Sequence, residues 1–504
     1  MNTCFKQPAL IAALCAAFGG LMATSTAFAT DHGDTALVNG VTRNDARLTD
    51  YFAMNRGDNI AFIIDTNPTI GARGVAQSAY VFPTDVKFTA NIDNHSAVNF
   101  DDAVRNVQHG GTVTNPAGIK ENFTFTFTFA AGNVLSVNMS SSDTALGISG
   151  FYPTEVKQGD LVYVLGSGFK SDETKVKVNG RTAPFSYVVS DNVMVFIAPF
   201  GGKTGVVTIS TENESTDVEA SVTSASELVV NKFKGFNPDA IAKLDTIISN
   251  TVATNAIKAG NALALADIGL PVKSFSDLRD DPFIRLPQQG RNIAAMAFEL
   301  PQSLFTHGRQ KVLLSWGTSA FNSLTGDSSD VAGRSFATMF TPEQNSVVDA
   351  NGVNHPTLNV LHPSQHVAAL EAREAAAPAP GAANRAMFLL PCQTAFQAFS
   401  TTNPAQQLAP LSTNCAPGQR MLKTPDVIIF DTSKAQNFPN GRDLPNDQID
   451  YIGTFDPRVE NLRREEMTAP ANPLDRHGVP FVLSPSQNDV PHDTNFPYLG
   501  LPQD

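Results

Sequence analysis

The adjacent carboxylates of Asp280 and Asp281 have the residue type and the spacing to bind a metal ion. Pro282 follows them and favours an extended backbone for the residue before it. Two carboxylates side by side suit calcium, which prefers oxygen ligands. In the structural alternative, which is favoured, one carboxylate pairs with Arg279 and the other caps a turn, a common role of aspartate.

A second candidate metal site lies among three histidines further along the chain. His362 and His366 are four residues apart, and His355 is close by. On one helix the first two side chains would face the same way and could hold zinc. Pro363 places His362 before the first turn of such a helix, so solvated or core histidines are the favoured alternative.

An acidic loop at Asp443, Asp447 and Asp450 stands beside Arg442. Its oxygen-rich side chains suit calcium, although no ligand spacing singles them out. The sequence contains no H-E-x-x-H, G-x-S-x-G, P-loop or complete EF-hand motif. An enzyme would therefore have to assemble its site from scattered Asp and His residues.

The first residues predict export. Lys6 precedes an apolar run at residues 9–19, and Ala27 and Ala29 fit the small-x-small rule for signal peptidase. The apolar run is shorter than the about 20 residues that span a membrane. We expect residues 1–29 to be a signal peptide. The mature chain would then be periplasmic, outer-surface or extracellular, with no transmembrane segment.

Cleavage after Ala29 would create a third candidate metal site at the new terminus. The mature chain would begin with Thr30, Asp31 and His32. Its amine, two amide nitrogens and the imidazole can surround Cu(II) or Ni(II) in one plane. In the alternative, His32 is tied into the fold and Asp34 orients its ring. Calcium, copper or another divalent metal is the cofactor that these sites would take.

The cysteines that remain after cleavage are Cys392 and Cys415. In an exported chain this pair predicts one disulfide bond. Closing a loop of this size stabilises the fold by about 3 kcal/mol. The absence of C-x-x-C spacing disfavours a metal-binding pair.

Hydrophobic periodicity predicts a mainly β protein with few helices. Phe123, Phe125, Phe127 and Phe129 alternate with threonines, which places four rings on one face of a sheet. Further strands are predicted at residues 59–64, 86–92, 291–300, 311–316 and 427–430. Residues 375–381 are a predicted linker, and the later chain is expected to form long loops.

The longest predicted helix begins at Asn237 and Pro238, a capping residue followed by proline in the first turn. Its apolar stripe is expected to pack on a sheet. The stripe consists of Ile241, Leu244, Ile247, Ile248, Val252 and Ile257. A second short helix is predicted at residues 364–377.

Short β-rich runs between residues 147 and 222 are separated by Gly, Pro and Asn-Gly turns. The characteristic positions are Ile148, Ser149, Gly150, Pro153, Gly159, Gly166, Gly168, Phe169, Val178, Asn179 and Gly180. This pattern resembles an IPT/TIG domain. The resemblance implies an immunoglobulin-like β-sandwich at residues 146–222 that serves as a spacer or as a surface for proteins or glycans. A spacer without a ligand is the favoured interpretation.

The segments on either side of that stretch form an ordered series of short motifs. They are residues 30–34, 45–52, 278–283, 290–301, 438–442, 488–491 and 496–499. In this order they resemble a secreted bacterial family known only as a domain of unknown function, whose mature chains often begin Ser-Ser-His-Arg-Glu-Ala-Pro. Gly33 and Asp34 depart from that start. The resemblance implies a secreted, β-rich protein and supplies no activity.

Together these patterns predict a split β-sandwich-like host domain at residues 30–145 and 223–504, with the immunoglobulin-like domain inserted between its parts. The net charge of -13 in 504 residues argues against nucleic acid and anionic membranes as partners. The expected function is non-enzymatic binding of a protein or glycan at the cell surface. The alternative is a secreted metalloprotein that uses Asp and His of the host loops, with hydrolysis as one activity open to it.

Overall fold

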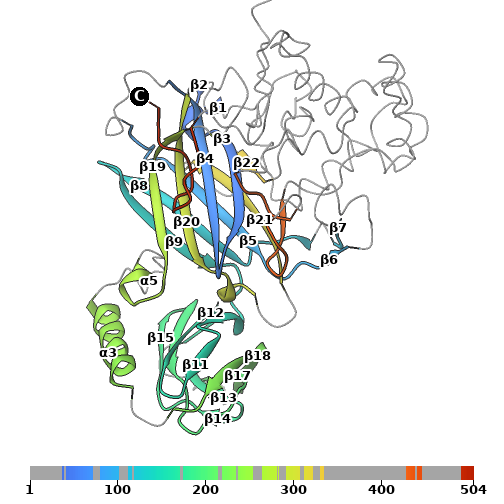
Figure 1. The fold of residues 1–504 in the computed structure, drawn as a ribbon, viewed down its shortest axis with the longest axis vertical. Coiled ribbons are helices and arrows are strands. Elements are labelled where there is room, and N and C mark those ends of the chain that lie inside the picture. Colours follow the sequence, from blue (N-terminus) through green and yellow to red (C-terminus); the bar gives the residue numbers. More distant parts are fainter. Residues whose placement is uncertain are drawn as a thin grey trace, which may run out of the picture.

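Two β-sandwiches, one above the other in Figure 1, make up most of the described part of the chain. The computed structural model describes residues 37–38, 41–71, 80–100, 112–115, 118–170, 174–213, 218–233, 237–253, 264–280, 282, 291–306, 311–321, 330–333, 427–436, 440–444 and 490–503. The predicted helix at residues 364–377 and the predicted linker at residues 375–381 lie outside these ranges.

The upper sandwich is the host domain, and each of its sheets joins strands from before and after the insert. The first sheet has the order β19-β20-β4-β3. Its strands are β3 (Leu48–Arg56), β4 (Asn59–Gly71), β19 (Lys273–Asp280) and β20 (Arg291–Pro301). The predicted split β-sandwich is therefore confirmed.

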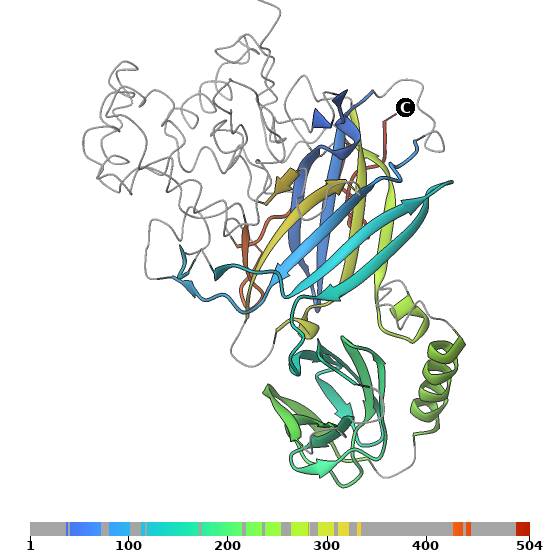
Figure 2. The same cartoon turned by 180° about the vertical axis from the view of Figure 1, so that it is seen from behind.

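The second host sheet lies behind the first in Figure 1 and faces the viewer in Figure 2. Its order is β22-β21-β5-β8-β9, and β23 also pairs with β21. The strands are β5 (Val86–Asp93), β8 (Phe123–Ala130), β9 (Val134–Ser141), β21 (Val312–Phe321), β22 (Asp330–Ala332) and β23 (Ile428–Asp431). Minor elements are β1 (Leu37–Val38), β2 (Val41–Thr42), β6 (Val98–Asn99), β7 (Thr112–Val113), and the 3-10 turns η1 (Asn44–Ala46) and η4 (Gln302–Leu304).

The Phe-Thr alternation of β8 fills the space between the two host sheets. All of its phenylalanine side chains are buried, and the intervening threonines are half-buried on the other face. The ring centroid of Phe125 lies 4.6 Å from that of Phe298 on β20. Because successive side chains of a strand point to opposite faces, this alternation gives β8 one apolar face and one hydroxyl face. The sequence prediction for this strand is confirmed.

The lower sandwich is the inserted module, which has its own apolar core. Its sheets have the orders β10-β12-β16-β15 and β11-β18-β17-β13-β14. The strands are β10 (Gly147–Tyr152), β11 (Glu155–Lys157), β12 (Leu161–Ser167), β13 (Thr174–Val178), β14 (Arg181–Thr182), β15 (Ser186–Ser190), β16 (Val193–Ile197), β17 (Gly205–Asn213) and β18 (Val218–Asn231). The last strand thus continues beyond residue 222, to Asn231.

The predicted helix is present as α3 (Pro238–Ala253), and it packs against the module. The Asn237 side chain accepts a hydrogen bond from the Ala240 amide at 3.3 Å, as expected of a helix cap. Leu244 and Ile247 are buried in one cluster with Tyr163 of the module. The short helix α5 (Ala264–Asp267) extends this cover, and Tyr163 donates a hydrogen bond to the carbonyl of Ile268 just beyond it. The sheet β10-β12-β16-β15 is therefore covered on both faces.

The module docks tightly on the host at the end of β10. A Cβ atom added at Gly150 would lie 2.0 Å from the carbonyl oxygen of Ser303 in η4, so no larger residue fits there. The buried Asn94 side chain donates to Ser149 Oγ at 2.7 Å and to the Phe305 carbonyl at 3.0 Å. These contacts fasten the two sandwiches end to end.

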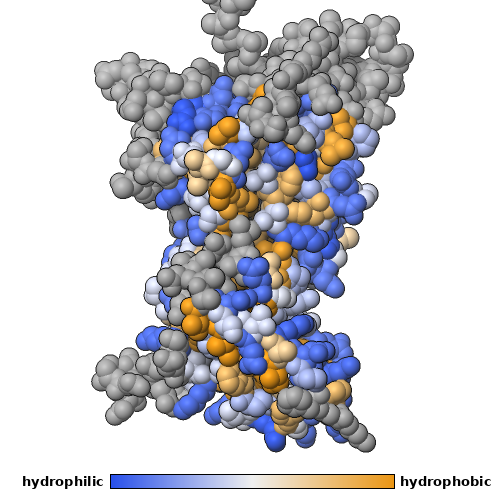
Figure 3. Space-filling model, turned by 90° about the vertical axis from the view of Figure 1, so that its left-hand side faces the viewer, coloured by the Kyte–Doolittle hydropathy of each residue, from blue (hydrophilic) through white to orange (hydrophobic). Residues whose placement is uncertain are grey.

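The surface on the left of Figure 1, turned to the viewer in Figure 3, is a mosaic. Among its described residues, hydrophobic and hydrophilic side chains alternate in small patches over both sandwiches. A mixed surface of this kind is normal for a protein that faces water.

Replacement of Ile247 by alanine tests the cover that α3 provides. Ile247 is 0% exposed, and removing a buried isoleucine side chain is expected to lower the free energy of unfolding by about 2–5 kcal/mol. Val252 lies on the same helix but is 69% exposed, so Val252→Ala should change it by less than about 0.5 kcal/mol. Urea unfolding of both variants measures the difference. Equal losses would contradict the packing of α3 on the module.

Candidate functional site

Most of the residues predicted to carry metal or redox chemistry lie outside the described residues. They are Asp31, His32, Asp34, Asp281, His355, His362, His366, Cys392, Cys415, Asp447 and Asp450. Of the acidic pair and the acidic loop, Asp280 and Asp443 are described, and both are buried. Within the described ranges, no three His, Cys, Asp or Glu side chains come close enough together to hold a metal ion.

Asp280 fastens the C-terminal segment of the chain to β19. Its carboxylate accepts a hydrogen bond from the Gln503 side chain at 2.6 Å, and its amide donates to the Gly500 carbonyl at 3.2 Å. The Asn292 side chain of β20 donates to the Gln503 carbonyl and accepts from the Gln503 backbone amide, at 2.8 Å each. The neighbouring Arg279 lies with its guanidinium 4.1 Å from the centre of the Phe275 ring. Asp280 thus holds Gln503 and Gly500, two residues that the sequence did not single out as its partners.

Glu299 anchors the same C-terminal segment from β20. Its buried carboxylate accepts hydrogen bonds from Tyr498, from Lys273 at 2.9 Å and from Asn59 at 2.8 Å. Burial alone raises the pKa of Glu299, but these hydrogen bonds and the Lys273 charge outweigh it and lower the pKa below its ordinary value. The carboxylate therefore stays ionised and acts as an anchor rather than as a proton donor.

Arg442 joins two segments that are far apart in the sequence. Its guanidinium forms a buried ion pair with Asp50 and donates to the Tyr51 carbonyl at 2.9 Å. It also lies 4.3 Å from the centre of the Phe52 ring, and its backbone pairs with Ala53. Two of the motifs in the sequence thus meet through Arg442 and Asp50, at the edge of the first host sheet that β3 forms. Their contacts are structural.

A polar pocket with a volume of about 400 Å³ opens in the host beside the connection to the module. Clefts that hold small molecules usually measure about 300–1,000 Å³. The lining comes from the last residue of β5 and the segment after it, from the connection between β7 and β8, and from Asp143 in the connection after β9. The lining residues are Asp93, His95, Ser96, Ala97, Thr114, Asn115, Gly118, Lys120, Asn122 and Asp143.

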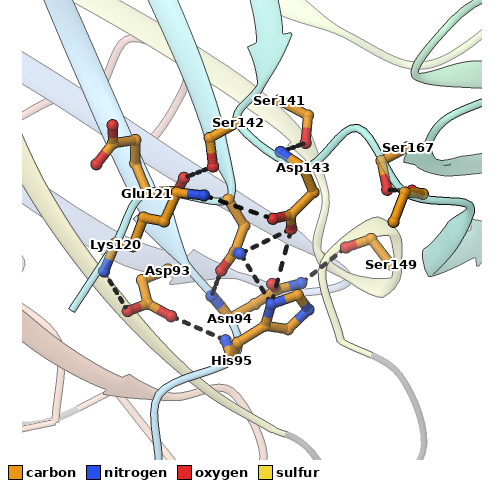
Figure 4. A network of polar contacts seen from close by, with 12 residues as sticks. Asp93, Asn94, His95, Lys120, Glu121, Ser141, Ser142, Asp143, Ser149 and Ser167 are labelled. Carbon is orange, nitrogen blue, oxygen red and sulfur yellow. Dashed lines mark hydrogen bonds and ion pairs between the residues drawn. The ribbon is translucent and has the colours of Figure 1, made fainter. Parts of the chain in front are cut away.

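Asp93 at the end of β5 connects the segments that line this pocket. Its carboxylate accepts hydrogen bonds from the His95 amide, the Ser96 amide and hydroxyl, and the Lys120 amide, at 2.6 to 3.2 Å. These donors, visible in part in Figure 4, satisfy both oxygens of the carboxylate. Asp93 therefore shapes the loop and leaves ligand contacts to its neighbours.

Asn122 organises the functional side chains of the pocket. Its oxygen accepts from the Asn94 amide at 3.1 Å, which fixes the orientation of the side chain. Its NH2 group then donates to His95 Nδ1 at 2.8 Å and to Asp143 at 2.9 Å. Lys120 Nζ lies 3.9 Å from the other oxygen of Asp143. The site thus presents an imidazole and a carboxylate that are both hydrogen-bonded to Asn122, with an ammonium in an ion pair beside the carboxylate.

The pocket is also linked to the insert. Asp143 lies just after β9, in the connection to β10, and its amide donates to Ser141 Oγ at 3.1 Å. Ser167 of the module donates to the Ala145 carbonyl in the same connection at 2.7 Å. Asn94, which orients Asn122, holds Ser149 of β10. A ligand in this pocket would therefore contact the joint between the sandwiches.

Sequence reasoning missed this pocket, because none of its residues forms a motif. Its members are spread from Asp93 to Asp143 and come together through the pairing of β5 with β8 and of β8 with β9. The available signal was the run Asp93, Asn94, His95 at the end of a predicted strand. Polar residues at strand ends are common in turns, so this signal alone has little specificity.

The fold and this site define a class: a split β-sandwich that carries an inserted immunoglobulin-like module. Residues 146–227 match the IPT/TIG domain. The chain therefore contains an IPT/TIG domain, as the sequence pattern indicated. The match covers the module and leaves the host sandwich without a named family.

Several solved structures share a limited likeness with the chain. An auxiliary nutrient binding protein from Bacteroides ovatus is 23% identical, over 18% of this chain and 21% of that one, with a TM-score of 0.16. A putative phosphatase from Bacteroides thetaiotaomicron is 24% identical over 18% of this chain and 19% of that one, also with a TM-score of 0.16. SGBP-B of the Bacteroides ovatus mixed-linkage glucan utilization locus, in complex with a heptasaccharide, is 12% identical over 36% and 54%, with a TM-score of 0.14.

This chain spans about a fifth of the length of the first of these proteins. Likenesses with TM-scores this low define neither the fold nor the function of the chain. Among curated proteins, none is significantly similar to it. Within the described residues, no helix is long and apolar enough to cross a membrane.

Replacement of Arg442 by alanine tests the buried ion pair. It would leave Asp50 charged and buried without its guanidinium, which is expected to lower the free energy of unfolding by about 3–5 kcal/mol. Arg43 pairs with Asp85 in a more exposed place, so Arg43→Ala should cost less than about 1 kcal/mol. Chemical unfolding of both variants gives the comparison. A loss for Arg442→Ala no larger than for Arg43→Ala would refute the proposed importance of this pair.

His492 predicts a pH dependence of stability. Burial and the nearby Arg56 lower the pKa of its imidazole from 6.5 to about 4, and its Nε2 has no hydrogen-bond partner among the described residues. Between these pKa values the unfolded chain binds a proton that the folded chain does not. Stability should therefore fall as the pH falls from 6.5 towards 4. Unfolding at about pH 7 and about pH 5 should show a smaller loss in His492→Asn than in the unmodified protein. An identical loss in both would rule out this source.

Proposed function

We propose that this protein is an exported, non-enzymatic binding protein whose polar pocket takes a small polar ligand beside the joint with the IPT/TIG domain. Export rests on the leader-like residues 1–29 and on the resemblance of the host segments to a secreted bacterial family. The observation that carries the binding function is the pocket itself, with its preformed network around Asn122.

The hydrogen bonds of this network favour binding over catalysis. The carboxylate of Asp93 accepts hydrogen bonds from backbone and hydroxyl donors. Nδ1 of His95 accepts its hydrogen bond from the amide of Asn122, and not from the hydroxyl of a serine nucleophile. A general base must have its own acceptor atom within hydrogen-bond reach of the proton that it removes. Ser96, the hydroxyl nearest in the sequence, donates to Asp93 at 2.6 Å. The groups are thus engaged in holding the shape of the site.

Asn122 gives the most direct test, because it orients the ligand-facing side chains without charge. The chain lacking residues 1–29 would be screened by thermal shift against sugars, amino acids and small dicarboxylates. Asn122→Ala should weaken the binding of any compound found by about ten- to a hundredfold, since it removes the bonds that hold His95 and Asp143. Asn138→Ala, on the exposed face of β9, is the matched control.

Mass spectrometry of the recovered compound separates binding from turnover. An unchanged compound supports the proposal, and a converted one contradicts it. Metal analysis of the purified protein examines the metalloprotein alternative, which relies on Asp31, His32, Asp281 and the histidines at 355–366. One tightly held zinc or copper ion per chain that is required for binding or conversion of the compound would support the metalloprotein alternative instead. A screen in which no compound stabilises the protein would also refute the proposal.

A further inference from the structure

We infer that the polar pocket binds a neutral saccharide unit. This ligand class rests on the binding function proposed above and narrows it. The pocket is the one lined by Asp93, His95, Ser96, Ala97, Thr114, Asn115, Gly118, Lys120, Asn122 and Asp143. Its walls, hydrogen-bonding groups and charges each point to this class.

The residue types that line the pocket suit a ligand with many hydrogen-bonding groups. Among the residues that line it, Ala97 is the sole aliphatic side chain, and the His95 imidazole is the sole ring. Sites for apolar ligands and for most peptides instead gather hydrophobic and aromatic side chains. Since the volume is about 400 Å³, a molecule larger than a simple ion fits.

Donors and acceptors alternate at short range in this site. Lys120 Nζ lies 3.9 Å from Asp143 Oδ1, so an ammonium donor and a carboxylate acceptor stand next to each other. A hydroxyl group both donates and accepts, unlike an ammonium, a carboxylate or a metal ion. Neighbouring hydroxyls on a sugar ring can accept from Lys120 and donate to Asp143 at the same time. This pair therefore matches a diol.

His95 adds one hydrogen-bond donor, its Nε2 atom. Because Asn122 donates to its Nδ1, the neutral imidazole carries its proton on Nε2. The side chain is 58% exposed, and it belongs to the lining of the pocket. Thr114 and Asn115 on the opposite segment supply a hydroxyl and an amide, groups that again both donate and accept. These donors and acceptors together can hydrogen-bond the several hydroxyl groups of a polyol.

The charges of the site disfavour ionic ligands. Lys120 and Asp143 largely offset one another, and Asp93 adds a negative charge that its donors already satisfy. An acidic ligand would meet Asp143 and Asp93, whereas an amine would meet Lys120. Like charges placed together lower affinity and so provide discrimination. A neutral ligand avoids both penalties. Because no Phe, Tyr or Trp lines the pocket for a sugar to stack on, its affinity is expected to be modest.

The test compares neutral sugars with charged versions of the same sugars. A panel of oligosaccharides with gluco, galacto, manno and xylo configurations would be measured by calorimetry against the chain lacking residues 1–29. Each sugar with a primary hydroxyl is paired with its uronate, and each is paired with its 2-amino form. At least one neutral member should bind, and its charged counterparts should bind at least about tenfold more weakly, in line with like-charge discrimination.

Variants locate the site. Lys120→Met and Asp143→Asn should each weaken sugar binding by at least about tenfold, as expected for hydrogen bonds to charged groups. Lys87→Met, at an exposed position of β5 outside the lining, should leave it unchanged. Both pocket residues are partly exposed, at 57% and 31%, and circular dichroism would confirm that the variants are folded.

Each outcome has a separate meaning. Sugar binding that survives both pocket substitutions would place the sugar elsewhere and overturn this inference. Binding of an amino acid or dicarboxylate that Lys120→Met abolishes, with no sugar bound, would overturn the ligand class and keep the proposed function. Binding of a uronate more tightly than its neutral parent would likewise refute the class. If no compound binds, both proposals fail.

Discussion

The pairing of β4 with β20 is the constraint on which the rest of the structure depends. Residues 59 to 71 pair with residues 301 to 291 along the whole length of both strands, although an entire module separates them in the sequence. The pairing requires the two ends of the insert to return to the same edge of the host. The module meets this requirement because β10 contacts η4 of the host and α5 leads into β19. Apolar packing between the sheets then stabilises the closure against the entropy of a long loop.

Local patterns allowed the main elements to be predicted. The alternation in β8 and the cap at Asn237 each depend on residues that are neighbours in the sequence, so their outcome could be read directly. The IPT/TIG pattern could be recognised because its glycines mark turns in a fixed order. The partner of α3 was not predicted, because an apolar stripe shows that a helix packs but not which sheet it covers.

The candidate site was predictable only in part, for a physical reason. The role of Asp280 stayed open between metal ligand and structural carboxylate, because the deciding contact comes from Gln503 at the other end of the chain. The pocket escaped notice since Asn122 connects Asn94, His95 and Asp143 only after three strands have paired. Networks of buried amides have no spacing rule in the sequence, whereas metal motifs on one helix do.

The division of each host sheet between distant parts of the chain has a consequence for the order of events on the ribosome. When β4 has been synthesised, β3 is its available neighbour, and β20 follows only after more than two hundred further residues. The strands of the IPT/TIG domain, in contrast, are contiguous from Gly147 to Asn231. The nascent chain can therefore complete its internal immunoglobulin-like unit while the surrounding sandwich is still half-built. Tyr498 and Gln503 are synthesised well after β20, and they then clamp the sheet that β3 and β4 began.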